Sequence, residues 1–177
     1  MSIAKHFQHY LQKHDVSYQV IEHVHSDSAM QSSHLAHVSA RQVAKAVVLE
    51  QRNRQGFVMA VIPACNKLNL SWLNETLNLH LHLLEENRLA SIFIDCELGA
   101  VPPIGTLYHM RTIWDSALQS VGDLYLEAGD HRHLLRVAPK DLTKLNPCGV
   151  YEEVSVPRDD YPSLLSQALR PVHMQSN

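Results

Sequence analysis

The chain has 177 residues, of which 45% are hydrophobic and 19% are charged, and its formal net charge is −3. This length and composition favour one globular domain with a core of its own. The acidic balance excludes a protein that coats nucleic acid over a broad surface, because such proteins carry a basic surplus. Any contact with nucleic acid is therefore expected at a local patch around one site.

The three cysteines, Cys65, Cys96 and Cys148, are widely separated and odd in number. They suit neither a disulfide framework nor a zinc knuckle, and they favour a reducing compartment. No run is apolar enough to span a bilayer, and the first residues lack the pattern of a signal peptide. We therefore expect a cytoplasmic protein without membrane contact, in which each cysteine is a small buried side chain rather than a nucleophile.

The first half of the chain alternates helical and strand patterns. Ile3, Phe7, Tyr10 and Leu11 recur at helical spacing and predict an amphipathic helix that ends near His14. The next predicted elements are a strand over residues 16–23, a helix over 28–37, and a hairpin of strands over 43–50 and 57–63.

The second half adds helices and short strands around a loop that is rich in glycine and proline. The predicted elements are helices over residues 69–78 and 85–93, a loop over 97–105, strands over 111–114, 123–129 and 133–137, and a helix over 138–145. Some strands are adjacent and others are separated by helices, which favours an α+β or compact α/β domain with a mixed sheet wrapped by helices. No glycine-rich phosphate loop follows a strand, so a Rossmann or P-loop nucleotide site is not expected.

Lys45 interrupts the apolar strand "VAKAVVLE" and shares one face of it with Val43, Val47 and Leu49. Two interpretations are open. The lysine stem lies along the sheet and its amine reaches water, or the amine lines a pocket and holds a phosphate or a developing oxyanion. An unpaired buried ammonium is costly, so an inward lysine favours a pocket for an anion unless a carboxylate such as Glu97 or Asp95 pairs with it.

The loop "GAVPPIG", residues 99–105, also has two interpretations. It is a tight connection in which Pro102 and Pro103 restrict the backbone and Gly99 and Gly105 allow unusual dihedral angles. The same rigidity would also let it present bare backbone N–H groups to a carbonyl or hydroxyl of a ligand.

Histidines occur in three pairs with a spacing of two, which would share a face if each pair lay in a strand. The pairs are His23 and His25, His80 and His82, and His131 and His133. Zinc sites normally add a third ligand at a characteristic spacing, and neither an HExxH motif nor paired cysteines are present. No metal site and no cofactor are therefore expected, and a metal-binding protein remains a minor alternative.

Five segments follow one another as they do in the YbaK/ProX family, which the chain resembles from about Val16 to about Leu145. They are "VAKAVVLE", "GFVMAVIPACNKLNL", "ELGAVPPIG", "TIWDSAL" and "APKDL". Members of that family are trans-editing aminoacyl-tRNA deacylases related to the editing domain inserted in some prolyl-tRNA synthetases. The resemblance implies a mixed sheet curled into a partly closed barrel and surrounded by helices. It places the domain at residues 1–150, followed by a tail at 151–177 with a helix expected at 161–169.

The resemblance also implies a set of site residues. Lys45 matches the strand lysine of the pocket for the tRNA acceptor end, and Gly99, Pro103 and Gly105 match the Gly-x-x-x-Pro loop and the glycine that often closes it. These four are the candidate catalytic residues. The candidate substrate-binding residues are Ala46, Ala100, Val101, Asp115 and His131.

The function implied by the resemblance is hydrolysis of the ester that joins a small mischarged amino acid to tRNA. The implied partners are the tRNA acceptor end and, as a further candidate, an aminoacyl-tRNA synthetase; DNA is not among them, and the expected state is a monomer or weak homodimer. Ala46 and Pro102 depart from the family pattern and bear on which amino acid is removed. The alternative is a catalytically inactive module that binds aminoacyl-tRNA or a nucleotide.

Overall fold

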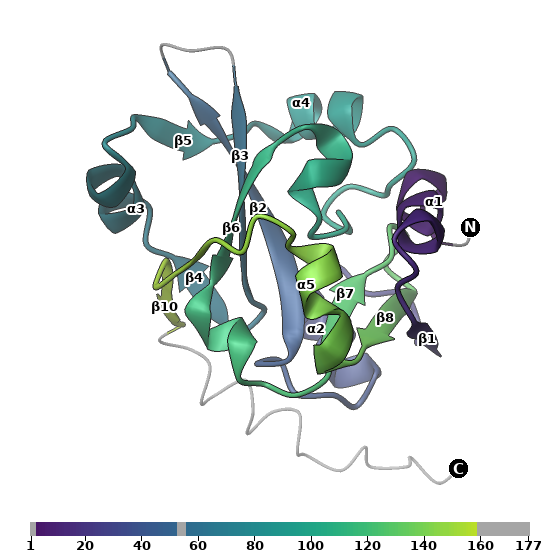
Figure 1. Ribbon diagram of the computed structural model, residues 1–177. Helices are drawn as coiled ribbons and strands as arrows, with labels where there is room; N and C mark the ends of the chain where they lie inside the picture. Colours follow the sequence, from purple (N-terminus) through teal and green to yellow (C-terminus); the bar gives the residue numbers. More distant parts are fainter. Residues whose placement is uncertain (1–2, 53–55, 159–177) are drawn as a thin grey trace, which may run out of the picture.

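The computed structural model describes residues 3–52 and 56–158 (Figure 1). The helices are α1 (Lys5–Lys13), α2 (Ala29–Leu35), α3 (Leu70–Leu77), α4 (Glu86–Ile92) and α5 (Leu142–Leu145), with the 3-10 helices η1 (Gly105–Tyr108), η2 (Ser116–Gln119) and η3 (Pro139–Asp141). The strands are β1 (Tyr18–Glu22), β2 (Val43–Gln51), β3 (Phe57–Pro63), β4 (Asn66–Leu68), β5 (Leu81–Leu83), β6 (Arg111–Asp115), β7 (Leu124–Glu127), β8 (His133–Val137), β9 (Tyr151–Glu152) and β10 (Ser155–Pro157).

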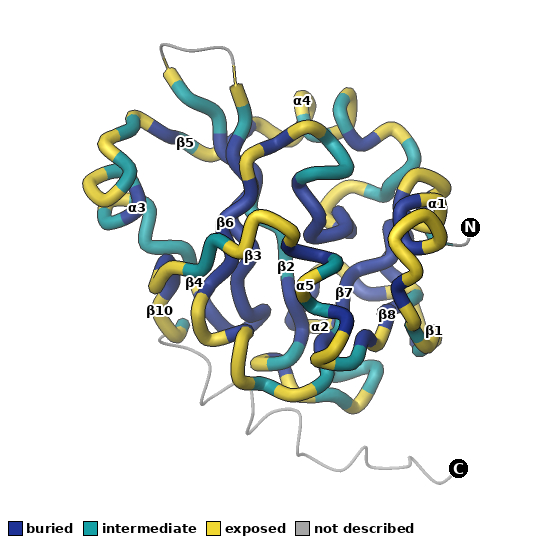
Figure 2. Tube along the Cα trace, viewed as in Figure 1, coloured by how far each residue is buried: buried dark blue, intermediate teal, exposed yellow. Residues whose placement is uncertain are grey.

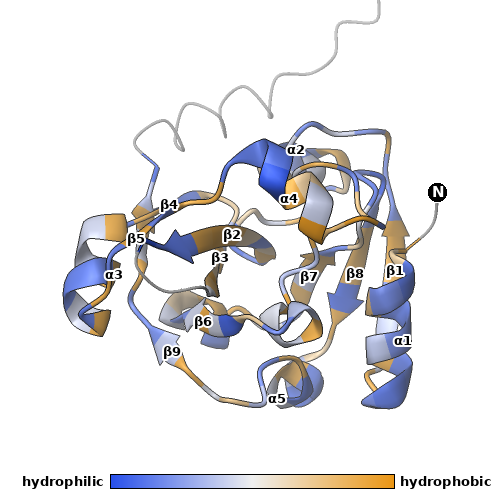
Figure 3. Ribbon diagram, turned by 90° about the horizontal axis from the view of Figure 1, so that it is seen from above, coloured by the Kyte–Doolittle hydropathy of each residue, from blue (hydrophilic) through white to orange (hydrophobic). Residues whose placement is uncertain are grey.

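An eight-stranded mixed sheet forms the centre of the molecule. Its strand order is β1-β8-β7-β2-β3-β6-β9, and β5 pairs with the far end of β2. The β2–β3 hairpin is antiparallel, whereas β2 with β7 and β3 with β6 are parallel. The sheet curls, so that β7 and β8 stand beside α1 while β6 and β9 lie on another side (Figure 3). This arrangement confirms the expected mixed sheet surrounded by helices.

Side-chain caps explain where several of these elements begin. The Ser28 hydroxyl accepts a hydrogen bond from the Gln31 amide at the start of α2, and the Asn69 side chain accepts one from the Trp72 amide at the start of α3. Such caps satisfy amides that have no partner inside the helix. α3 ends at Asn78, which takes the left-handed conformation common at helix ends.

The two faces of β2 belong to different parts of the core. Ala44 and Val48 pack in the largest cluster, whereas Leu49 packs with Ile62 and Ile113 in a second cluster on the other face. This alternation follows from the two-residue period of a strand. In Figure 2 the central strands are mostly buried, and the outer turns of α1 and α5 are exposed.

The structure adds four short strands that the sequence pattern did not predict: β4, β5, β9 and β10. Two of them lie in the segment expected to begin the tail, because Tyr151–Glu152 pairs with β6 and Ser155–Pro157 pairs with β4. The helix expected at 161–169 lies outside the described residues. None of the described helices is long and apolar enough to cross a membrane.

Candidate functional site

Lys45 is half-buried near the start of β2, and its ammonium group donates hydrogen bonds to two backbone carbonyls. The Nζ atom lies 2.7 Å from the Asn66 oxygen and 3.3 Å from the Ala64 oxygen. Burial lowers the pKa of this ammonium, the Arg158 charge lowers it further, and Cys65 acts in the opposite direction. The positive charge is therefore held where water solvates it poorly.

No carboxylate pairs with Lys45 among the described residues. Asp95 accepts hydrogen bonds from the amide and ring of His6, and Glu97 lies 3.3 Å from the His25 ring. The alternative in which Asp95 or Glu97 forms a buried pair with the lysine therefore does not hold. A cation held by carbonyl groups alone keeps most of its charge available to an anion.

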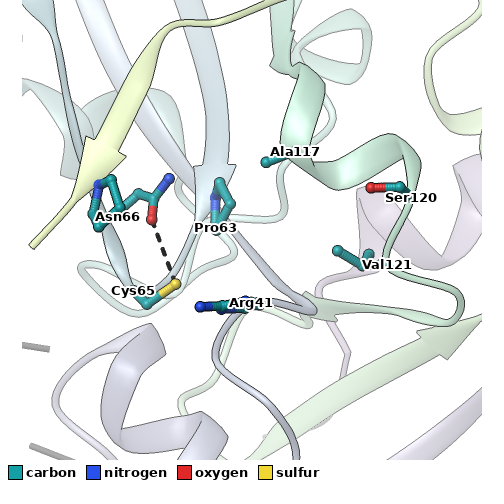
Figure 4. A pocket seen from close by; sticks show the side chains of 8 residues that line it. Arg41, Pro63, Cys65, Asn66, Ala117, Ser120 and Val121 are labelled. Atoms are coloured by element: carbon teal, nitrogen blue, oxygen red, sulfur yellow. Dashed lines mark hydrogen bonds between the residues drawn. The ribbon is translucent and has the colours of Figure 1, made fainter. Parts of the chain in front are cut away.

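A cavity of about 410 Å³ is lined in part by Asn66, whose carbonyl holds Lys45; Figure 4 shows the side chains around this cavity. Its lining residues are Arg41, Pro63, Cys65, Asn66, Ala117, Ser120, Val121 and Pro157. Arg41 is exposed and places a cation in the wall, whereas Lys45 lies behind Asn66 and does not line the cavity. The Cys65 thiol lies 3.5 Å from the Asn66 side-chain oxygen, and burial raises its pKa, so it stays protonated and is no nucleophile. The cavity therefore offers positive charge without a reactive thiolate.

Asp115 supports this cavity but does not line it. Its carboxylate accepts hydrogen bonds from the Ser155 hydroxyl at 2.6 Å and from the Ala117 amide at 2.9 Å. Ser155 in turn accepts from the Asn66 side chain at 2.8 Å. Because the Asn66 carbonyl holds Lys45, this chain of hydrogen bonds fixes the position of the ammonium. The geometry gives Asp115 a supporting place, and its predicted contact with substrate stays a prediction.

The loop over residues 99–105 is largely buried. Val101 and Ile104 pack in the same cluster as Ala44 and Val48, on the face of β2 opposite Lys45. Ala46 packs against that cluster too, so it points away from its neighbour Lys45. The middle of the loop and the lysine are therefore not brought together, although Ala100, Val101 and Pro103 are all buried.

Gly99 and His131 are in direct contact. Gly99 has φ = +90°, and its Cα faces the His131 ring so closely that a Cβ there would lie 3.5 Å from two ring atoms. The His131 Nε2–H group donates to the Leu98 carbonyl at 2.7 Å, and His131 itself has φ = +53°. Left-handed backbone at a residue other than glycine costs energy and persists where its surroundings hold it. The two predicted site residues thus anchor the start of the loop together.

Glu127 is a buried site residue that the sequence analysis missed. Tyr125 pairs with Val43 in the parallel β7–β2 ladder, and Glu127 and Lys45 each follow their strand's member of that pair by two residues. Both side chains therefore project from the same face of neighbouring strands. The sequence signal was available, since an acid within the apolar "LYLE" is as unusual as a lysine within "VAKAVV".

The Glu127 carboxyl group is only half satisfied. Its Oε1 atom accepts from the Ser32 hydroxyl at 2.7 Å, but its Oε2 atom and the His131 Nδ1 atom are buried without a hydrogen-bond partner in the described part of the chain. Burial raises the pKa of Glu127, and Asp130 raises it further, while Ser32 and His131 oppose that shift. The polar group inside this face is therefore an acid that resists ionisation.

The histidine pairs do not form shared strand faces. His131 and His133 separate at the start of β8, where His133 binds Asp130 at 2.6 Å, and His82 lies 3.5 Å from Glu50. Within residues 3–52 and 56–158, no three His, Cys, Asp or Glu side chains are grouped so that they could hold a metal ion. Cys148 is exposed, so the expectation that every cysteine is buried is wrong there.

The model of the aminoacyl-tRNA editing domain family matches this chain over residues 23–145. Because this match covers more than half of the sequence, the chain belongs to that family, and the resemblance stated from its motifs is confirmed. No curated protein matches the sequence at a significant level.

Solved structures share the fold at low sequence identity. The hypothetical protein APE2540 is 20% identical with a TM-score of 0.75, and the match covers 86% of this chain and 100% of that one. A protein described as a candidate trans-editing enzyme for prolyl tRNA synthetase is 19% identical with a TM-score of 0.74, covering 86% and 96%. A candidate signal transduction protein from Marinobacter aquaeolei VT8 is 16% identical with a TM-score of 0.68, covering 85% of this chain and 30% of its own.

Proposed function

We propose that this protein hydrolyses the ester bond between a small mischarged amino acid and its tRNA, acting in trans to the synthetase that made the error. The observation that carries the proposal is the Lys45 ammonium, half-buried beside a cavity and held by carbonyls rather than by a carboxylate. Membership of the editing-domain family supplies the class of substrate. A tRNA acceptor end is a polyanion, so it fits a cavity beside Arg41 and Lys45, neither of which pairs with a carboxylate among the described residues.

Lys45 and Arg41 would act on the terminal nucleotide. The cavity of about 410 Å³ has room for part of a nucleotide; Arg41 in its wall, and Lys45 behind Asn66, would hold a phosphate or the charge that develops during reaction. Positioning of this kind lowers the barrier because the reacting groups no longer have to find one another.

The loop over residues 99–105 would orient the ester or the attacking water through its backbone N–H groups. Gly99, at the start of the loop, lies against His131, which interacts electrostatically with Glu127. Water adds to the ester carbonyl, the bond from the carbonyl carbon to the ribose oxygen breaks, and a proton passes to that oxygen. A ribose hydroxyl of the tRNA assists, as the resemblance to the deacylase family implies, so the protein itself needs no nucleophile.

Replacing Lys45 tests the proposal. In Lys45→Met the stem keeps its length and the charge is lost, and we expect deacylation of a mischarged tRNA to fall about a hundredfold. Stability should change little, because a partly desolvated ammonium contributes little to folding. The measurement is single-turnover deacylation across a panel of mischarged tRNAs, with thermal unfolding of the same preparations.

Lys140→Met is the matched control, since Lys140 is exposed in η3. It should keep wild-type activity. A Lys45→Met protein that is strongly destabilised but fully active in its folded fraction would show that the lysine is structural. A wild-type protein that binds aminoacyl-tRNA and deacylates no member of the panel would instead identify an inactive binding module.

A further inference from the structure

α1 carries an unusual concentration of basic and polar side chains for a chain with a net charge of −3. Its buried face is Phe7, Tyr10 and Leu11. The exposed residues from the start of α1 to the residue that ends it are Lys5, His6, Gln8, His9, Gln12, Lys13 and His14, and none of them is acidic. Figure 3 shows α1 at the edge of the molecule with a largely hydrophilic surface. The exposed side of α1 therefore carries two lysines and three histidines, of which His6 contacts Asp95.

A hollow of about 290 Å³ lies between this helix and η1. Its wall consists of His9, Tyr10, Lys13, His14, Thr106, Leu107 and Pro147. A lysine in the last turn is also favourable to the helix dipole, which explains Lys13 but not the concave surface beside it. A lysine beside a hollow differs from a lysine on a flat helix end, because a concave basic surface can contact a ligand group from several sides.

Polar groups in the wall are fixed in place or left without partners. The Tyr10 hydroxyl donates to the Lys144 carbonyl at 2.9 Å, and its ring stacks on His14 with centroids 4.2 Å apart. Lys13 is exposed and has no carboxylate partner within the part of the chain that the structure describes. A fixed wall beside an unpaired cation is suited to an oxyanion.

We propose that this hollow is a second RNA contact, which binds a phosphate group of the tRNA backbone at a distance from the reacting end. The proposal rests on the proposed function for the identity of the polyanion. Lys13 and His9 stand one helical turn apart on the same side of α1, so both can reach one phosphate. Thr106 belongs to η1, which directly follows the loop over residues 99–105. The contact would therefore dock the tRNA against the element that continues the candidate catalytic loop.

The test compares a long substrate with a short one. The variant is the double replacement Lys13→Gln and His9→Gln, in which both positions are exposed and the fold should persist. The substrates are a full-length mischarged tRNA and an aminoacylated CCA trinucleotide, which is too short to reach a second site. With the tRNA we expect KM to rise about 5- to 10-fold at unchanged kcat. The slope of the logarithm of the binding constant against the logarithm of the salt concentration should become shallower by about one. With the trinucleotide, both constants should be unchanged.

Arg52→Gln is the matched control, since it removes one exposed charge at the β2–β3 hairpin, away from α1. It should leave both substrates unaffected. The proposal is overturned if the double variant has the same KM for tRNA as Arg52→Gln. It is also overturned if the KM of the double variant for the trinucleotide rises as much as its KM for tRNA. If wild-type protein deacylates nothing but binds uncharged tRNA, and the double variant loses that binding, the proposed function fails while the second contact stands.

Discussion

The two faces of β2 differ in what they bury, although they belong to one strand. One face carries Ala44, Ala46 and Val48 into an apolar cluster. The other carries Lys45 and, through the neighbouring strand β7, Glu127. Asp115 on β6 follows Ile113 by two residues, and Ile113 packs in the cluster on that second face, so its carboxylate belongs there too.

The difference shows that apolar packing and ionisable side chains lie on opposite faces of the same strand. The apolar face needs close packing, and its polar exceptions are few. The face that carries Lys45 also has an apolar cluster, but at one end it holds a lysine and two acids, none paired with an opposite charge among the described residues. Lys45 and Glu127 are expected to add little to stability, so a ligand is the simplest reason for keeping them, whereas Asp115 is held by hydrogen bonds from Ser155 and Ala117. The substitutions below probe the two faces, beginning with the largest expected effect on stability.

Asp115→Ala should cost the most. The substitution removes the cap of η2 and leaves the buried Ser155 hydroxyl without its acceptor. A lost cap costs about 1 kcal/mol and a hydrogen bond to a charged group about 1.5–3 kcal/mol, so we expect a loss of about 3 kcal/mol in the free energy of unfolding. Urea denaturation measures it.

The activity of the same variant shows whether Asp115 positions Lys45 or contacts the substrate itself. Because Asn66 holds both Ser155 and Lys45, deacylation should fall through a misplaced lysine, and Asp115→Asn should recover part of both properties. Full stability with lost activity would instead place Asp115 in direct contact with the substrate.

Gly105→Ala tests the apolar face. A Cβ at residue 105 would overlap the Thr112 hydroxyl oxygen and lie 3.2 Å from the Met59 Cβ, so the loop cannot keep its position. Overpacking of this kind costs about 1–3 kcal/mol, so we expect the free energy of unfolding to fall by about 2 kcal/mol, measured by thermal or urea unfolding. Adding Thr112→Ala removes the overlapping atom and should restore part of the loss. No restoration in the double variant would show that the loop backbone, rather than this contact, requires glycine.

Sequence alone could predict the Lys45 face but not the groups that hold it. The two-residue period of "VAKAVVLE" correctly placed Lys45 with Val47 and Leu49. Ser28 and Asn69 were readable as residues that open a helix, because capping depends only on nearby residues. The elements that local patterns specify were therefore predicted with small errors at their ends.

Contacts between distant segments were beyond the sequence. β4 and β10 have three residues each, too few to show a period, and they pair across about half of the chain. Their pairing brings Ser155 to Asn66 and Asp115, which no local pattern indicates. The requirement for glycine at residue 105 was expected from backbone freedom, yet the structure explains it by a side chain on β6.

Glu127→Gln is the subtlest test of the face that carries Lys45. The folded state raises the pKa of Glu127, chiefly by burial. Its contribution to stability is therefore fully present below the pKa of an unfolded glutamate, about 4.3, and is lost as the pH rises through the folded-state pKa. Glutamine stays neutral at every pH, keeps an acceptor for Ser32, and offers an N–H where Oε2 now has no partner.

The variant should therefore be more stable than the wild type at pH 8, by about 1 kcal/mol, which is the lower end of the cost of an unsatisfied buried polar group. The advantage should shrink towards zero near pH 4. Urea unfolding at several pH values measures it, with Glu22→Gln, an exposed glutamate on β1, as a control that should show no such trend. A constant difference across the pH range would mean that Glu127 does not titrate between the two states. A loss of stability at pH 8 would mean that a protein group or water satisfies the ionised carboxylate, and the contrast between the two faces of β2 would then be smaller than their residues indicate.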